Sequence, residues 1–321
     1  MKRFRMNAGA NECFRQDTMT DPLKGIAALV VACTVWGLSP LFYKMLAHVP
    51  AIEVLAHRTI WSAVIFSTIL LVQRRFFVLW ETLSQWRMFV TVATAALLVS
   101  TNWFLYIWSV GAGYVTESSL GYFLFPLVAV VLGRIVLGET LGKSQKVGVA
   151  LAACGVATLT FGLGAAPWIA LGLATTFGLY GLIKKTLDLG PVISVTGEVV
   201  VLLPIAGIVL WLAPSGSTQF GYDALETFLL IVSGFFTAIP LILFSYATRR
   251  IKLSTVGLIQ YLNPSLQFFC AVLIFSEPFG MWHAIAFSMI WIALAFYSIG
   301  SLLSDRAEAM ASTQASGSST T

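Results

Sequence analysis

The chain alternates between long apolar runs and short polar segments. Ten apolar runs follow Pro22, each close to the roughly 20 residues that a helix needs to cross the hydrocarbon core of a bilayer. Their approximate limits are residues 24–44, 54–72, 88–109, 118–137, 145–162, 167–183, 192–212, 225–246, 255–275 and 281–303. Because lipid offers no water to backbone N–H and C=O groups, each run is expected to be a helix. The pattern predicts an all-α polytopic membrane protein with ten transmembrane helices.

Part of this pattern occurs twice. The stretch 118–146 returns in degenerate form at 256–284, where Pro126 matches Pro264. The offset places the fourth run on the ninth, so each half of the chain holds five helices. An odd number of spans reverses the second half relative to the first, which predicts an inverted-topology repeat. The expected units are residues 21–163 and 164–303, between disordered cytoplasmic tails at 1–20 and 304–321.

The distribution of lysine and arginine agrees with ten spans. Of the 19 such residues, all except Lys44 and Arg58 fall on one side of the membrane if the spans alternate. Positive residues concentrate in cytoplasmic loops, so both termini are predicted to be cytoplasmic. The composition, 58% hydrophobic and 10% charged with a mean hydropathy of +0.87, also defines a membrane protein. The net charge of +5 therefore indicates orientation and does not predict a nucleic-acid partner.

Catalytic and metal-binding patterns are missing from the sequence. The four cysteines show no Cys-x-x-Cys spacing, so neither a disulfide nor a metal site is indicated. A membrane-embedded enzyme would need nucleophile, base or metal ligands clustered at one depth, and only His57 with Glu53 comes near this. We therefore expect no enzyme, no cofactor and no metal. The apolar periodicity begins only after Asp21, which leaves Met1 and Met19 as alternative starts.

Two positive residues break the charge rule on the external side. Lys44 closes the first run and is expected to extend toward the interface. Arg58 lies a turn inside the second run, beside His57 and on the helix that carries Glu53. Two interpretations stay open for it: a structural ion pair, or contact with a substrate carboxylate or phosphate and a proton relay through His57.

Further polar residues lie at membrane depth. They are Asn102, Glu198, Gln260, Asn263 and Gln267. A buried Glu198 is a candidate proton carrier, with a structural hydrogen bond as the alternative.

Prolines and aromatic residues mark the same depth. Pro126 and Pro264 free the carbonyls of Tyr122 and Gln260, which either line a cavity or are satisfied by neighbouring helices. Trp103 and Tyr106 lie deep in the third run, where they are candidates to stack on an aromatic or cationic substrate.

Seven short motifs resemble the RarD family, in the EamA branch of the drug/metabolite transporter superfamily. They are WGLSPL (36–41), HRTIWS (57–62), NWFLYIWSV (102–110), SLGYF (119–123), PWIAL (167–171), FGLYGL (177–182) and QYLNP (260–264). The resemblance covers residues 21–303 and implies a ten-helix inner-membrane permease. The residues on the family's polar and aromatic motif positions are His57, Arg58, Asn102, Trp103, Tyr106, Glu117, Tyr122 and Glu198.

The chain departs from the expected family pattern at two places. Phe125 precedes Pro126 where an asparagine is expected, and residues 111–113 read Gly-Ala-Gly where a polar residue is expected. These departures affect contacts on that side of the cavity.

The sequence predicts a secondary transporter of the bacterial inner membrane. Alternating access would export a small amphipathic metabolite or drug, such as an amino acid or a chloramphenicol-like compound, from a cavity between the second to fourth and seventh to ninth spans. A lipid-handling or regulatory membrane protein is the alternative. The expected partners are a solute, the bilayer and protons as the candidate coupling ion, and a homodimer stays open. The candidate site residues are His57, Arg58, Asn102, Trp103, Tyr106, Glu117, Tyr122, Glu198, Gln260 and Asn263.

Overall fold

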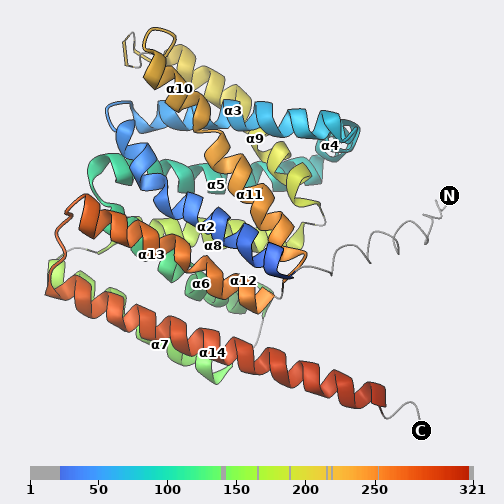
Figure 1. Cartoon of the computed structure of the whole chain (residues 1–321), viewed down its shortest axis with the longest axis vertical. Helices are drawn as coiled ribbons and strands as arrows, with labels where there is room; N and C mark the ends of the chain where they lie inside the picture. Colours follow the sequence, from blue (N-terminus) through green and yellow to red (C-terminus); the bar gives the residue numbers. More distant parts are fainter. Residues whose placement is uncertain are drawn as a thin grey trace.

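In a computed structural model, the chain forms a bundle of helices (Figure 1). The structure describes residues 22–138, 142–164, 166–187, 189–214, 216–217, 220–251 and 253–317. The described elements are α2 (Pro22–Met45), α3 (Ala51–Val72), α4 (Phe76–Ser84), α5 (Trp86–Ala112), α6 (Val115–Leu137), α7 (Lys143–Leu163), α8 (Trp168–Thr186), α9 (Pro191–Leu212), α10 (Ala224–Val232), α11 (Phe235–Thr248), α12 (Leu253–Gln260), α13 (Leu262–Phe269), the π-helix η1 (Cys270–Ile274) and α14 (Met281–Gly317).

Nine of the predicted spans correspond to described helices that are long and apolar enough to cross a membrane. The predicted run 167–183 corresponds to α8, which is helical but does not belong to these nine. Its last turn carries Lys184 and Lys185, and these charges lower the mean hydropathy of the helix. The tenth span therefore stays a prediction, although α8 packs along both α5 and α6 inside the bundle.

Consecutive long helices alternate in direction, so their ends gather at two ends of the bundle (Figure 1). We call the end that holds Arg74, Arg134, Lys184 and Arg249 the basic end, and the other the opposite end. The start of α2 and the end of α14 both lie at the basic end.

Two predicted single helices are interrupted in the structure. The run 225–246 divides into α10 and α11 at Ser233 and Gly234, where α3 comes so close that a Cβ on Gly234 would lie 2.8 Å from the backbone nitrogen of Ser62. The run 255–275 divides at Tyr261, one turn before Pro264, and ends in the π-helix. Proline cannot donate a backbone hydrogen bond, so the chain tolerates it near the start of α13.

Two further helical segments were not expected. The short helix α4 follows α3 at the basic end, where Leu79 packs with Leu70 and Ile193. Helix α14 continues to Gly317, so the predicted disordered tail from Ser304 begins instead as a helix. Residues 306–311 include arginine, glutamate, methionine and three alanines, all strong helix formers, and this favours the extension. The predicted N-terminal tail and Glu139, which the offset of the predicted repeat matches with Glu277, lie outside the described residues.

The helices pack in pairs that mirror one another between the halves of the chain. Helix α3 packs on α9, and α7 packs on α14. The contact of α2 with α11 has its counterpart in the contact of α8 with α5. The contact of α6 with α8 likewise corresponds to that of α13 with α2. A central space lies between these pairs.

Candidate functional site

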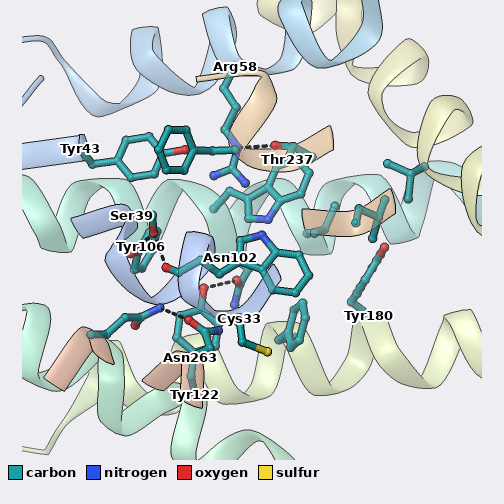
Figure 2. A pocket seen from close by; sticks show the side chains of 18 of the residues that line it. Cys33, Ser39, Tyr43, Arg58, Asn102, Tyr106, Tyr122, Tyr180, Thr237 and Asn263 are labelled. Carbon is teal, nitrogen blue, oxygen red and sulfur yellow. Dashed lines mark hydrogen bonds between the residues drawn. The ribbon is translucent and has the colours of Figure 1, made fainter. Parts of the chain in front are cut away.

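A cavity of about 980 Å³ of empty space occupies the middle of the bundle. Helices of both halves contribute to it (Figure 2). Its lining residues are Cys33, Trp36, Ser39, Tyr43, Arg58, Val99, Asn102, Trp103, Tyr106, Tyr122, Phe177, Tyr180, Val195, Glu198, Phe236, Thr237, Leu241, Gln260, Asn263 and Gln267. Aromatic rings dominate the wall, while Arg58 and Glu198 are its two charged residues. An apolar pocket with a few polar groups is typical of a small-molecule site.

Arg58 enters the cavity from α3, and its side chain is held by three neighbours. Its Nε donates a hydrogen bond of 2.8 Å to the Thr237 hydroxyl of α11. Its guanidinium carbon lies 4.3 Å from the ring centroid of Trp103 on α5, and 5.8 Å from that of Tyr43. None of these partners is acidic, so the guanidinium stays a buried positive charge stabilised by hydrogen bonding and cation–π contact.

Tyr106 is the centre of the aromatic wall. Its hydroxyl is 2.6 Å from the Ser39 hydroxyl of α2. Its ring makes edge-to-face contacts with Tyr43 at 5.9 Å and with Tyr122 at 5.8 Å. Edge-to-face pairs hold rings in fixed orientations, so the wall is a preformed surface for a planar or apolar group.

Asn102 connects three helices beneath this wall. Its amide nitrogen donates to the Leu173 carbonyl at 2.9 Å and to the Thr176 hydroxyl at 3.0 Å, both on α8. Its amide oxygen accepts a hydrogen bond of 3.0 Å from the Tyr122 hydroxyl on α6. Its hydrogen-bond partners among the described residues are Leu173, Thr176 and Tyr122, and the side chain is fully buried. Asn102 therefore positions Tyr122 and α8.

Asn102→Leu should destabilise the protein and displace Tyr122. The substitution removes the acceptor of the Tyr122 hydroxyl, at a cost of about 1–3 kcal/mol, whereas the Leu173 carbonyl and the Thr176 hydroxyl keep hydrogen bonds within α8. We expect a melting temperature several degrees lower, measured by the fluorescence of the purified protein during heating. The matched control is Thr101→Ala, since the Thr101 hydroxyl bonds only within its own helix. Equal melting temperatures for Asn102→Leu and Thr101→Ala would contradict this role.

The break between α12 and α13 brings amide groups to the cavity. Gln260, the last residue of α12, lines it together with Asn263 and Gln267 of α13. The Gln267 amide nitrogen donates to the Asn263 side-chain oxygen at 2.9 Å. The other polar atom of that amide, the buried Oε1 of Gln267, has no hydrogen-bond partner within the described part of the chain. An unpaired buried acceptor at a cavity wall is a suitable contact for a ligand donor.

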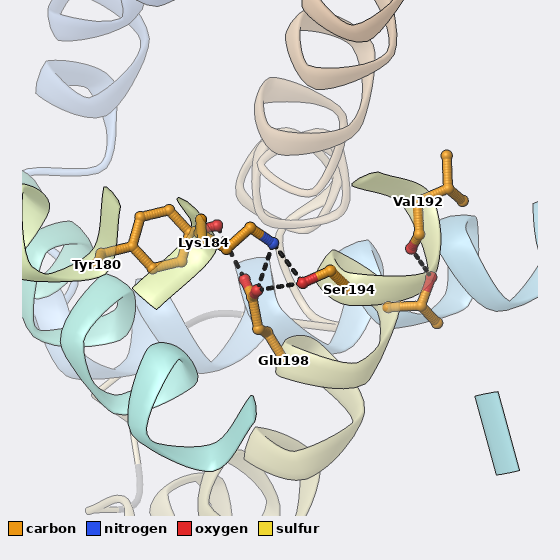
Figure 3. Close-up of polar contacts among 6 residues, drawn as sticks. Tyr180, Lys184, Val192, Ser194 and Glu198 are labelled. Atoms are coloured by element: carbon orange, nitrogen blue, oxygen red, sulfur yellow. Dashed lines mark hydrogen bonds and ion pairs between the residues drawn. The ribbon is translucent and has the colours of Figure 1, made fainter. Parts of the chain in front are cut away.

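Glu198 belongs to a polar network between α8 and α9 (Figure 3). Its Oε1 accepts hydrogen bonds from Lys184 Nζ at 2.8 Å and from the Ser194 hydroxyl at 3.0 Å. Its Oε2 accepts from the Tyr180 hydroxyl at 3.1 Å. Lys184 also donates to the Ser194 hydroxyl. The Glu198 carboxylate is 1% exposed, and the lysine compensates its charge.

Arg58 and Glu198 lie at the same position along their helices. Helices α3 and α9 are each 22 residues long and pack against each other. Arg58 is the eighth residue of α3, and Glu198 is the eighth residue of α9. The cavity thus carries opposite charges at matching helix positions.

A second cavity, of about 1770 Å³, extends the first toward the basic end. Both cavities share Tyr122, Phe177, Gln260 and Asn263. The second is also lined by Gln145 and Lys185, from the basic ends of α7 and α8. Toward the opposite end, an apolar cluster that includes Leu46, Val49, Val54, Ile107, Val110 and Leu229 fills the space between the helices. The two cavities are therefore neighbours, and the second lies on the side of the basic end.

The structure brings eight of the ten candidate residues to the first cavity. They are Arg58, Asn102, Trp103, Tyr106, Tyr122, Glu198, Gln260 and Asn263. Tyr122 and Gln260, matched across the predicted repeat, both line it.

His57 and Glu117 lie elsewhere. Neighbouring residues of a helix point about 100° apart, so Arg58 reaches the cavity while the His57 ring packs 4.4 Å from that of Phe220. Glu53 accepts a hydrogen bond of 2.8 Å from Ser217. Glu117 lies in the first turn of α6 at the opposite end, outside the cavity lining.

Several residues of the first and sixth spans line the cavity although they are not among the candidates predicted from the sequence. Trp36, Ser39 and Tyr43 of α2, and Phe177 and Tyr180 of α8, line the cavity. All except Tyr43 belong to the motifs WGLSPL and FGLYGL, so the signal was present. Lys184, which the sequence predicts among the positive residues on one side of the membrane, forms an ion pair with Glu198. Within the described residues, no group of three or more His, Cys, Asp or Glu side chains is placed to hold a metal ion.

Comparison with known proteins identifies the family. Residues 23–161 match the model of the EamA-like transporter family. A protein named RarD from Streptomyces exfoliatus is 43% identical over 273 residues, covering 84% of this chain and 87% of that protein. An uncharacterized transporter of Vibrio cholerae is 39% identical, covering 90% of this chain and 96% of its own. Escherichia coli RarD is 36% identical, with coverages of 88% and 97%.

A solved crystal structure shares the fold alone. It is 17% identical, with a TM-score of 0.57, and the match covers 85% of this chain and 96% of that one. The apolar helices, the central cavity and these relatives define a multi-pass transporter of the bacterial inner membrane. The chain belongs to the RarD family of EamA-like transporters, in the drug/metabolite transporter superfamily.

Proposed function

We propose that the protein is a secondary transporter that exports a small amphipathic solute through the central cavity by alternating access. The observation that carries this proposal is the pair of adjacent cavities, which share Tyr122 and Gln260. The first cavity contains Arg58, which has no acidic hydrogen-bond or ion-pair partner among the described residues and lies among aromatic rings. Such a lining suits an amphipathic molecule with an apolar ring and a polar group.

The packing supports ten helices in two inverted five-helix units. Mirrored contacts join α2 with α11 and α8 with α5, and the equal lengths of α3 and α9 fit a repeat. Residues 21–163 and 164–303 would then move relative to each other around the cavity. With the basic end in the cytoplasm, the described conformation is open to the cytoplasm, where an exporter takes up its solute.

The geometry favours different coupling residues from those expected. His57 lies outside the cavity, and Glu198 is ion-paired with Lys184. We therefore assign the candidate proton-binding site to the Lys184–Glu198 pair. A Pseudomonas aeruginosa relative named chloramphenicol-sensitive protein RarD is 27% identical over 280 residues, covering 84% of this chain and 92% of that protein. Chloramphenicol is therefore one compound to test.

The proposal is tested by flux in liposomes that contain the purified protein. Radiolabelled phenylalanine, benzoate and chloramphenicol are added with and without a pH gradient, and saturable uptake above empty liposomes is expected for at least one of them. Gly181→Trp should abolish this flux, because Gly181 lines the second cavity and a large side chain would fill it. Gly207→Trp is the matched control, since nothing lies within 4 Å of a Cβ at that exposed position.

A non-transporting lipid-handling or regulatory protein would give no flux of any tested solute under any gradient. Equal flux through wild type and Gly181→Trp would show that solutes do not pass through the second cavity.

A further inference from the structure

The charges around the first cavity do not cancel. Arg58 and Glu198 are the two charged residues of its lining, and Lys184 is the ion-pair partner of Glu198. Lys184 Nζ lies 2.8 Å from Glu198 Oε1, so the lysine neutralises the carboxylate. The guanidinium of Arg58 contacts Thr237, Trp103 and Tyr43, none of which carries negative charge. The uncompensated formal charge at the cavity is therefore that of one arginine.

We propose that Lys184 is a positioning residue whose ion pair with Glu198 makes the cavity selective for solutes with a single negative charge. This inference rests on the proposed transport through the cavity and names the class of solute. A monoanion with an aromatic body would place its negative group at Arg58 and its ring among Trp103, Tyr106 and Tyr122. A cation would be repelled by Arg58, the unpaired charge of the cavity lining. A dianion would carry a second negative charge that no positive group of the lining compensates in this low-dielectric site.

Among the groups around the Glu198 carboxylate, Lys184 is the one that compensates its negative charge. Helix α8 places Lys184 and Tyr180 against the carboxylate, and Ser194 reaches it from its own helix. The other helices packed on α9 are α3, α4 and α5, and within the described residues none of them places a charged or titratable side chain in hydrogen-bond or ion-pair contact with Glu198. Arg58 of α3 faces the same cavity. Without Lys184, the Glu198 charge would have Arg58 as its nearest compensation within that cavity.

Removing one or both members of the pair therefore changes selectivity in a defined direction. Lys184→Met leaves Glu198 as an unpaired buried carboxylate that offsets Arg58, so the cavity no longer favours an anion. The double variant Lys184→Met/Glu198→Gln leaves Arg58 as the single charge. Glu198→Gln alone leaves two positive charges and favours a dianion.

Four probes with one aromatic ring separate these cases: benzoate, benzamide, benzylammonium and phthalate. Binding to the purified protein in nanodiscs is measured by quenching of tryptophan fluorescence, because Trp36 and Trp103 line the cavity. Wild type should bind benzoate about 10-fold more tightly than benzamide or benzylammonium, the effect of one charge-assisted hydrogen bond. Lys184→Met should lose this preference, the double variant should keep it, and Glu198→Gln should prefer phthalate.

The double variant also controls for misfolding, because replacing a buried ion pair by neutral side chains of similar size is often neutral for stability. Lys146→Met is the matched surface control, as Lys146 is exposed on α7. The inference is overturned if wild type binds benzamide or benzylammonium as tightly as benzoate, if it binds no benzoate at millimolar concentration, or if the double variant behaves like Lys184→Met. Charge-selective binding without flux in liposomes would instead contradict the proposed transport and leave this charge assignment intact.

Discussion

Arg58→Gln is expected to lower transport of a negatively charged solute by about 10- to 100-fold while the protein stays folded. A hydrogen bond to a charged group contributes about 1.5–3 kcal/mol, and 1.4 kcal/mol corresponds to a factor of ten in binding. Glutamine keeps a donor that can reach Thr237 but removes the charge and the contact over Trp103. Uptake of labelled benzoate into liposomes gives the transport rate, and thermal unfolding reports the fold.

Two further variants separate charge from shape at this position. Arg58→Lys keeps the charge but loses the planar guanidinium that stacks on Trp103, so an intermediate rate is expected. Arg87→Gln removes an exposed arginine at the start of α5 and should transport like wild type. If Arg58→Gln and Arg87→Gln transported equally well, Arg58 would have only a structural role.

The hydrophobic pattern predicted most of the helices, because burial in lipid requires long apolar segments with internally satisfied backbones. It could not predict where a span is interrupted. The division at Gly234 depends on the close approach of α3, and the division at Tyr261 places three amides at the cavity. The extension of α14 beyond Ser304 reflects local helix propensity, which the apolar pattern does not report.

The candidate site residues were chosen from the sequence by residue type and by depth in the membrane. Arg58, Asn102 and Gln260 line the cavity. His57, which the sequence groups with Arg58, packs against Phe220 instead, because adjacent residues of a helix face different sides. The pairing of Glu198 with Lys184 could not be predicted from the sequence. Lys184 lies in the last turn of a different helix, where its sequence position is typical of a positive residue in a cytoplasmic loop.

Glu277 accepts three hydrogen bonds at the opposite end of the bundle. Its Oε1 accepts the backbone N–H of Val115 at 2.7 Å. Its Oε2 accepts the backbone N–H and the hydroxyl of Thr116, each at 2.7 Å. These N–H groups belong to the first turn of α6, where backbone N–H groups have no acceptor within the helix. The positive end of the helix dipole lies at the same turn. The carboxylate thus joins the segment after η1 to the start of α6.

If the proposed alternating access operates, this contact has to open, because α6 and the α13–η1 segment flank the cavity and are the predicted repeat partners. Glu277→Ala removes three charge-assisted hydrogen bonds and should shift the equilibrium toward an opening at the opposite end. Cys33 lines the cavity and serves as the reporter in a background where Cys13, Cys154 and Cys270 are serine. We expect a membrane-impermeant maleimide added outside intact cells to label Cys33 at least about 10-fold faster in Glu277→Ala, since each lost bond contributes about 1.5 kcal/mol or more.

The controls distinguish this opening from general loosening of the fold. Glu81→Ala removes an exposed glutamate of α4 at the basic end and should leave the labelling rate unchanged. Glu277→Gln keeps one amide oxygen as an acceptor and should fall between wild type and Glu277→Ala. If the maleimide labelled Cys33 equally fast in wild type and Glu277→Ala, the carboxylate would cap α6 without controlling access. If Glu277→Ala also unfolded at a much lower temperature, faster labelling would follow from lost stability, so the opening requires an unchanged melting temperature alongside the higher labelling rate.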